Sequence, residues 1–166
     1  MPANFWIVFV AALVPLIIGF IWYNPKVLGK QWMVAAGLTE EKMQGANMGL
    51  VFGLTYLFSI FLSSGLMAIV VHQLGALSLL SAQPDFAQEG SASSTMLKQF
   101  IDQYGTSYRT FKHGAFHGVL SGIMIALPIL GINAMFERKG FKYIAINVGF
   151  WVVCMALMGG IVCAGL

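Results

Sequence analysis

Charge is scarce in this sequence of 166 residues, because Asp, Glu, Lys and Arg together make up 9% of it. A soluble domain carries roughly 25%. Four long segments contain no charged residue at all: 3–24, 46–82, 114–136 and 143–166. Apolar residues make up 58% of the chain, and its mean hydropathy is +0.81. These values exclude an ordinary soluble domain and predict an integral membrane protein, since about 20 apolar residues in a helix cross the hydrocarbon layer.

Motifs of catalysis are also missing. The sequence has no GxSxG elbow, no phosphate-binding loop, no GxGxxG opening a helix and no CxxC pair. The charge-free segments contain no acid or base of the kind that marks a proton-coupled pump. Cysteine is limited to Cys154 and Cys163, which lie on opposite sides of one predicted helix and cannot bridge each other. We therefore predict a protein that is not an enzyme and carries no cofactor.

The few cationic residues are distributed by connection between the apolar segments. They do not form one patch with interleaved aromatic residues, so we expect no nucleic acid partner. The first connection contains Lys26, Lys30 and Lys42, the third Arg138, Lys139 and Lys142, and the second Lys98, Arg109 and Lys112 beside three acids. By the positive-inside rule, the first and third connections face the cytoplasm and both termini lie outside it.

The apolar segments predict a single all-α domain with four transmembrane helices. We expect these spans at about 4–23, 48–77, 112–136 and 142–165. No Lys or Arg precedes the first apolar run and Pro15 interrupts it, which favours a retained span over a cleaved signal peptide. The second span is expected to continue one helix that begins at Glu40 and runs to about Leu77. The third and fourth spans are joined by a short turn, which predicts an antiparallel hairpin.

Two shorter helices are predicted between the spans. Asn24 and Pro25 resemble an N-cap and a first helical residue, so a helix in the cytoplasmic interface should run from Pro25 to about Ala36. Its expected interfacial anchors are Trp22, Tyr23, Lys26, Lys30 and Trp32, with the lysines toward anionic headgroups. In the outer connection, apolar residues from Met96 to Tyr104 recur at helical spacing and Gly105 follows, which predicts an amphipathic helix.

Small residues recur every four positions on three of the predicted spans. These are Gly45, Gly49 and Gly53 on the second, Gly114, Gly118 and Gly122 on the third, and Ala156, Gly160 and Ala164 on the fourth. In lipid such residues allow helix backbones to approach closely, either inside the bundle or against another subunit. The polar residues within the spans are typical of hydrogen bonds between helices: Thr55, Ser59, Ser63, Asn133 and Asn147.

The three histidines are the sharpest chemical feature. His113 and His117 are one helical turn apart, and an antiparallel arrangement of the second and third spans brings His72 to the same depth near the outer face. Imidazoles placed this way could ligate a metal or a haem. Histidines at span ends also commonly bind water, headgroups or a carbonyl oxygen. We expect them to be dispensable, with no bound metal.

The segment Trp22, Tyr23, Asn24, Pro25, then Gly29, Lys30 and Trp32, continuing to Gly37 and Leu38, has the form WYxPxxxGxxW. With the glycine run at 114–122 and the pair Gly159 and Gly160, it resembles a family of small bacterial membrane proteins of unknown function. The resemblance implies a four-span inner-membrane protein and assigns no catalytic residue.

Three functional hypotheses follow. The first is a non-enzymatic membrane protein that acts by helix association, as a homo-oligomer or as an accessory subunit of a larger inner-membrane complex. The second is a small carrier or channel for an uncharged or lipid-like solute, with helix breaks at Pro15 and Pro128. The third is a metal or haem protein that uses the histidines.

Overall fold

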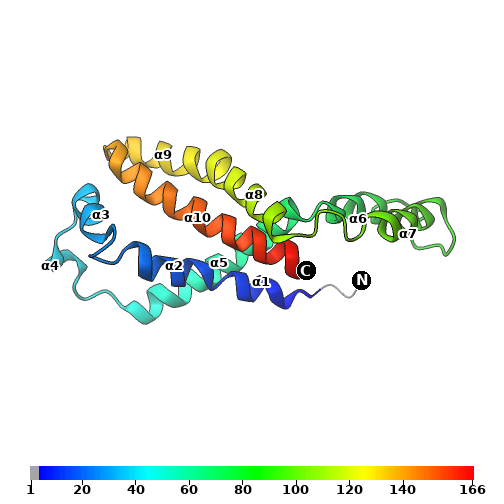
Figure 1. Cartoon of the computed structure of the whole chain (residues 1–166), viewed down its shortest axis with the longest axis horizontal. Helices are drawn as coiled ribbons and strands as arrows, with labels where there is room; N and C mark the ends of the chain where they lie inside the picture. The colour runs from blue at the N-terminus through cyan, green and yellow to red at the C-terminus, as the bar shows by residue number, and fades with distance from the viewer. Residues whose placement is uncertain (1–3) are drawn as a thin grey trace.

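The structure is a computed structural model that describes residues 4–166. These residues form helices and connecting turns and contain no strand. Figure 1 shows an elongated helical bundle from which a helical hairpin projects at one end. The elements are α1 (Trp6–Ala11), α2 (Val14–Trp22), α3 (Gly29–Ala36), α4 (Glu40–Met43), α5 (Met48–Val70), α6 (Gln73–Ser81), α7 (Ala92–Tyr104), α8 (Phe111–Ser121), the π-helix η1 (Gly122–Ala126), α9 (Leu127–Phe136) and α10 (Phe141–Gly165).

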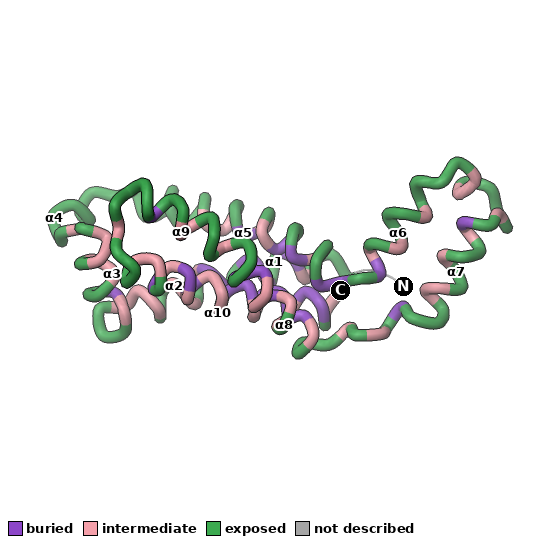
Figure 2. The backbone as a smooth tube through the Cα atoms, turned by 90° about the horizontal axis from the view of Figure 1, so that it is seen from above, coloured by how far each residue is buried: buried purple, intermediate pink, exposed green. Residues whose placement is uncertain are grey.

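Helix α10 forms the centre of the bundle. It contacts α1, α2, α3, α5, α8, η1 and α9. The buried core follows it and the facing part of α5, and its fully buried members are Ala11, Leu66, Val70, Val71, Cys154, Met158, Val162 and Cys163. Figure 2 shows that α9 and the hairpin are mostly exposed or half-buried. An exposed apolar helix such as α9 would be unstable in water, and this arrangement suits a hydrocarbon solvent.

Three helices are long and apolar enough to cross a membrane: Met48–Val70, Phe111–Phe136 and Phe141–Gly165. The first predicted span, residues 4–23, differs because it forms two short helices, α1 and α2, that together cover Trp6–Trp22. The break falls at Ala12 and Leu13, two residues before Pro15, which lacks the amide hydrogen that a continuous helix needs there. The structure therefore supports three spanning helices and a shorter apolar fourth.

The third span also contains a local irregularity. The π-helix η1 lies between α8 and α9, immediately before Leu127 and Pro128. A proline inside a helix removes one hydrogen bond and its ring collides with the carbonyl four residues earlier, which here belongs to Met124. The wider π turn accommodates this conflict without ending the helix. The antiparallel hairpin predicted for this span and α10 is confirmed by their packing along α8 and η1.

The expected continuous helix from Glu40 to Leu77 is wrong. The segment forms three helices, α4, α5 and α6. Between α4 and α5, Gly45 has φ = +84°, a left-handed conformation that prevents a continuous helix. The Asn47 side chain then accepts a hydrogen bond from the Leu50 amide at 3.1 Å and starts α5 anew. The second break follows Val70, where Val71 has φ = −110° and ψ = 88°.

The interfacial helix also begins later than predicted. Residues 24–28 form a turn in which the Asn24 side chain accepts from the Lys26 amide at 2.9 Å, and α3 begins only at Gly29. It ends as expected at Gly37, whose φ of +71° is left-handed. The Lys139 ammonium donates to the Ala36 carbonyl, so α3 and the α9–α10 turn lie at the same end of the bundle.

The projecting hairpin consists of α6 and α7, which pack against each other. The predicted amphipathic helix is confirmed as α7, and Gly105 is its C-cap. The Asp85 carboxylate accepts hydrogen bonds from the Ser93 hydroxyl and from the Ser93 amide in the first turn of α7. These bonds hold the pKa of Asp85 below its ordinary value. At the hairpin base, the buried Gln73 amide donates to the carbonyls of Tyr104 and Ser107, at 2.8 and 2.9 Å.

Candidate functional site

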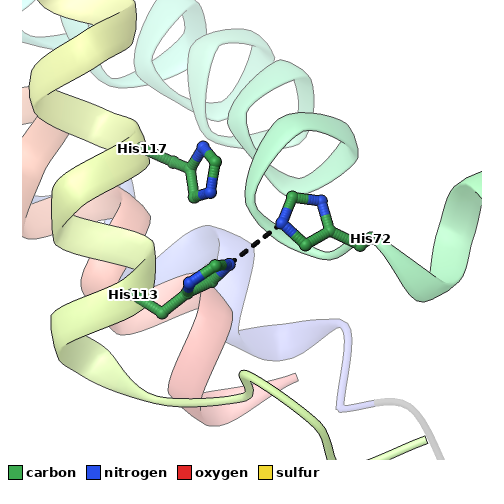
Figure 3. A group of neighbouring side chains, drawn as sticks. All are labelled: His72, His113 and His117. Atoms are coloured by element: carbon green, nitrogen blue, oxygen red, sulfur yellow. Dashed lines mark hydrogen bonds between the residues drawn. The ribbon is translucent and has the colours of Figure 1, made fainter. Parts of the chain in front are cut away.

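The three histidines of the chain form one cluster where the bundle meets the hairpin. Their ligand nitrogens all lie within 4.8 Å of one another, and the Nε2 atoms of His72 and His113 are 3.0 Å apart. Ring centroids are separated by 4.9 Å between His72 and His117 and by 4.5 Å between His113 and His117. Figure 3 shows the three rings directed toward one another. The predicted proximity of these side chains is confirmed.

Local backbone structure explains how His72 reaches the other two histidines. It lies in the break between α5 and α6, where the chain leaves the helical path and its side chain can turn toward α8. Thr110 starts α8 by accepting the His113 amide at 3.2 Å, which places His113 and His117 in the first two turns. His72 is exposed and the other two are half-buried, so the cluster is open to solvent on one side.

Other groups that could join the histidines are engaged elsewhere. Gln73 holds the hairpin base, as described above. Asp102 pairs with Lys98 on the exposed side of α7, with 2.6 Å between oxygen and nitrogen. The Cys163 thiol lies near the carbonyls of Val70 and Tyr108, at 3.4 and 3.3 Å. Within residues 4–166, the cluster therefore contains three imidazoles and no carboxylate or thiolate.

A second polar cluster lies at the opposite end of the bundle, around Asn147 of α10. Its side-chain oxygen accepts from the Tyr23 hydroxyl at 3.2 Å and from the Trp32 indole at 3.3 Å. Its amide group donates to the Tyr143 carbonyl at 2.7 Å. The Trp22 indole donates to the Ile146 carbonyl at 3.1 Å. The aromatic residues expected to anchor in the headgroups therefore direct their polar atoms toward α10.

The remaining members of the predicted interfacial set, Lys26 and Lys30, are exposed. The fold gives a reason for Gly29 within the WYxPxxxGxxW segment. A Cβ atom there would lie 2.9 Å from the Asn24 carbonyl carbon and closer still to the Tyr23 carbonyl oxygen. The absence of a side chain lets the turn fold back beneath Tyr23, which in turn places Trp32 beside the Tyr23 ring at 5.1 Å.

The three predicted series of small residues have different environments. Gly114, Gly118 and Gly122 face α10 so closely that a Cβ atom on any of them would overlap its backbone or side chains. On α10, Gly160 lies against the Phe111 ring, Ala156 faces Gly118, and Ala164 is exposed. In the second series, Gly45 lies outside α5, and no other helix comes within 4 Å of a Cβ atom placed on Gly49 or Gly53.

Sequence reasoning treated Asn147 as one of five equivalent polar residues, and the structure separates them. Thr55 bonds to the Val51 carbonyl of its own helix, at 2.8 Å. The Ser59 and Ser63 hydroxyls are buried among the described residues without a partner. Asn147 alone in this set collects donors from two other segments. Tyr23 and Trp32 are more than 100 residues away from Asn147 in sequence, so they could not be linked to it without the fold.

These features define an all-helical protein whose long apolar helices suit a membrane and whose polar groups collect at the two ends of the bundle. The chain belongs to a family of proteins of unknown function, DUF1761, whose model matches residues 6–163. No curated protein and no solved structure matches it. The match extends over the bundle and the hairpin, so the whole described fold belongs to this family.

Proposed function

We propose that this chain is a non-enzymatic integral membrane protein that works by helix association, as a homo-oligomer or as an accessory subunit of a larger complex in the inner membrane. Its partners are then the lipid bilayer and other membrane helices. The observation that carries the proposal is the start of α5. All residues from 48 to 54 are exposed, so the described chain leaves this stretch largely uncovered.

Gly49 and Gly53 make this exposed stretch suitable for a helix partner. They lie one turn apart on α5, and a Cβ atom placed on either would have no other helix within 4 Å. Against lipid alone, small residues give a helix little contact surface. They become favourable when a second backbone approaches them and gains dispersion contacts. Gly118 differs, because α10 of the same chain already packs against it. This contrast supports an association surface on α5 that the single chain leaves free.

An orientation in the inner membrane completes the proposal. The first and third connections carry most of the cationic residues, and the bond from Lys139 to Ala36 holds them at one end. At the other end, the Asn4 amide lies 3.4 Å from the Leu166 carbonyl, beside the hairpin. By the positive-inside rule the cationic end faces the cytoplasm and both termini lie outside it. The exposed Lys26 and Lys30 can then reach anionic headgroups.

The variant Gly53→Leu tests the association surface directly. Because the space around Gly53 is open, the leucine is accommodated within the chain, and its effect should appear only in assembly. Gly65→Leu is the matched control: Gly65 also lies on α5 in open space, but about 120° around the helix. The readout is native mass spectrometry of the protein extracted gently from its membrane.

We expect wild type and Gly65→Leu to show the same oligomer or the same co-purified membrane subunit, and Gly53→Leu to lose it. The proposal fails if wild type is a monomer with no associated subunit. It also fails if Gly53→Leu assembles as wild type does.

A further inference from the structure

We propose that His72, His113 and His117 bind one divalent transition-metal ion, with an exchangeable fourth ligand. This inference goes beyond helix association and assigns chemistry to the end of the bundle that carries the hairpin. It also reverses the expectation from sequence that the histidines are dispensable. Sequence showed only that three imidazoles share a depth, whereas the structure places all their ligand nitrogens within 4.8 Å of one another.

The spacing of the nitrogens suits one ion. Two imidazole nitrogens bound tetrahedrally to Zn²⁺ at 2.0–2.1 Å lie about 3.4 Å apart. The Nε2 atoms of His72 and His113 are 3.0 Å apart, so they need to separate by only a few tenths of an ångström. The ligand nitrogen of His117 lies within 4.8 Å of those of His72 and His113 and forms the third corner of the triangle. Small side-chain rotations are enough, because the backbone already brings the rings together.

The contacts within the cluster leave its binding capacity unused. The His72–His113 hydrogen bond engages one nitrogen of each ring and needs one neutral donor and one acceptor. No hydrogen bond involves the ring of His117 within the described residues. When the proton of the His72–His113 hydrogen bond moves to the outer nitrogen of its ring, three neutral imidazoles direct lone pairs into a common space. A cation at that position satisfies all three lone pairs at once, which a pairwise hydrogen bond cannot do.

The composition of the site selects the class of ion. Imidazole is a good ligand for zinc, copper, nickel and iron, while calcium and magnesium require oxygen ligands. Haem does not fit this geometry. Two imidazoles that bind one haem stand on opposite faces of a flat macrocycle. Here His72 and His113 are in direct contact, and ring centroids 4.5–5.0 Å apart leave no slot between any pair.

The position of the site in the fold gives it a fourth, open side. His72 is exposed and adjoins a cavity of about 300 Å³ that is also lined by Tyr104 and Tyr108 of the hairpin. Sites with three protein ligands keep their fourth position for water or a small ligand. The ion would also join the break between α5 and α6 to α8, and would thereby fix the base of the hairpin to the bundle.

The test uses the full chain, purified in mild detergent with any histidine tag removed, since the sequence itself has three histidines. After chelator treatment, Zn²⁺ is titrated by calorimetry, and Co²⁺ is added separately to report coordination by visible absorption. We expect one Zn²⁺ per chain, no competition from Mg²⁺, and a Co²⁺ spectrum typical of four-coordinate nitrogen ligation. His113→Ala and His117→Ala should each weaken Zn²⁺ binding at least about tenfold.

Lys112→Ala is the matched control, because Lys112 is exposed beside His113 and contributes no ligand. It should retain wild-type affinity. If either α8 variant fails to fold, His72→Ala provides the test at an exposed position outside the helices. The proposal is overturned if wild type binds no stoichiometric Zn²⁺, or if binding is unchanged in the histidine variants.

Discussion

Substitution of Gly118 by leucine should destabilise the bundle strongly, because α8 and α10 approach closely there. An ideal Cβ at Gly118 would lie 2.6 Å from the Met155 carbonyl carbon and 2.7 Å from the Ala156 Cα. Both neighbours are backbone atoms, so no side-chain rotation relieves the overlap. Ordinary contact between carbon atoms requires 3.5–4.0 Å, which means that the helices must separate by about 1 Å.

The magnitude follows from the loss of dispersion contacts. A contacting atom pair contributes about 0.1–0.2 kcal/mol, and a gap of 0.5–1 Å removes a quarter to a half of this. If about 50 pairs along the α8–α10 interface are affected, the loss is about 1–5 kcal/mol. In lipid, where the hydrophobic drive between helices is small, such contacts supply much of the stability of the bundle.

The assay is thermal unfolding of the purified protein in detergent, supported by limited proteolysis of the α8–α10 hairpin. Gly131→Leu is the control, since Gly131 belongs to the same spanning segment and has nothing within 4 Å of its Cβ position. We expect Gly118→Leu to unfold at a much lower temperature than Gly131→Leu. Equal stability of the two variants would refute the argument that these glycines permit close packing.

Two further predictions concern orientation and the Asn147 cluster. Single cysteines at Glu89 and Gly140, in a background without the native cysteines, should react differently with an impermeant thiol reagent in whole cells, and labelling at Gly140 alone would mean the opposite topology. Asn147→Leu leaves the Tyr23 and Trp32 donors without an acceptor, and each should cost about 1–3 kcal/mol of stability, measured by thermal unfolding. An unchanged unfolding temperature would show that water or headgroups replace the lost acceptor.

Much of the fold could be predicted from the sequence because its signals are local. The charge-free segments identify the long apolar helices, and the turn at 137–140 is too short for anything but an antiparallel hairpin. The amphipathic spacing of residues 96–104 predicts α7, and Gly105 predicts its end. The meeting of the three histidines follows from the same reasoning, since antiparallel spans of similar length bring corresponding ends together.

The break after α5 shows where such reasoning fails. No charged residue interrupts the segment up to Leu77, and neither glycine nor proline lies at Val71, where the helix ends. A weaker signal was present in Ile69, Val70 and Val71, three consecutive β-branched residues that disfavour a helix slightly. A propensity of this size does not end a helix by itself. The packing of Val70 and Val71, which are both fully buried against the core, determines where α5 ends.

The direction of the aromatic side chains around Asn147 also depends on the tertiary structure. Trp22, Tyr23 and Trp32 can place their polar atoms in the headgroups or against a neighbouring helix, and the sequence is the same in both cases. Their contact with α10 depends on the close turn that Gly29 permits.

By itself, the sequence determined the apolar and helical character of this protein, the approximate position of its long helices and the end of the bundle at which its histidines lie. These properties depend on composition and on spacing along single helices. Only the tertiary structure decided which glycines pack against another helix, which side chains donate hydrogen bonds to Asn147 and how close the imidazoles come to one another. Each of those depends on the separation and rotation of two helices distant in sequence, which a change of about 1 Å can make or break.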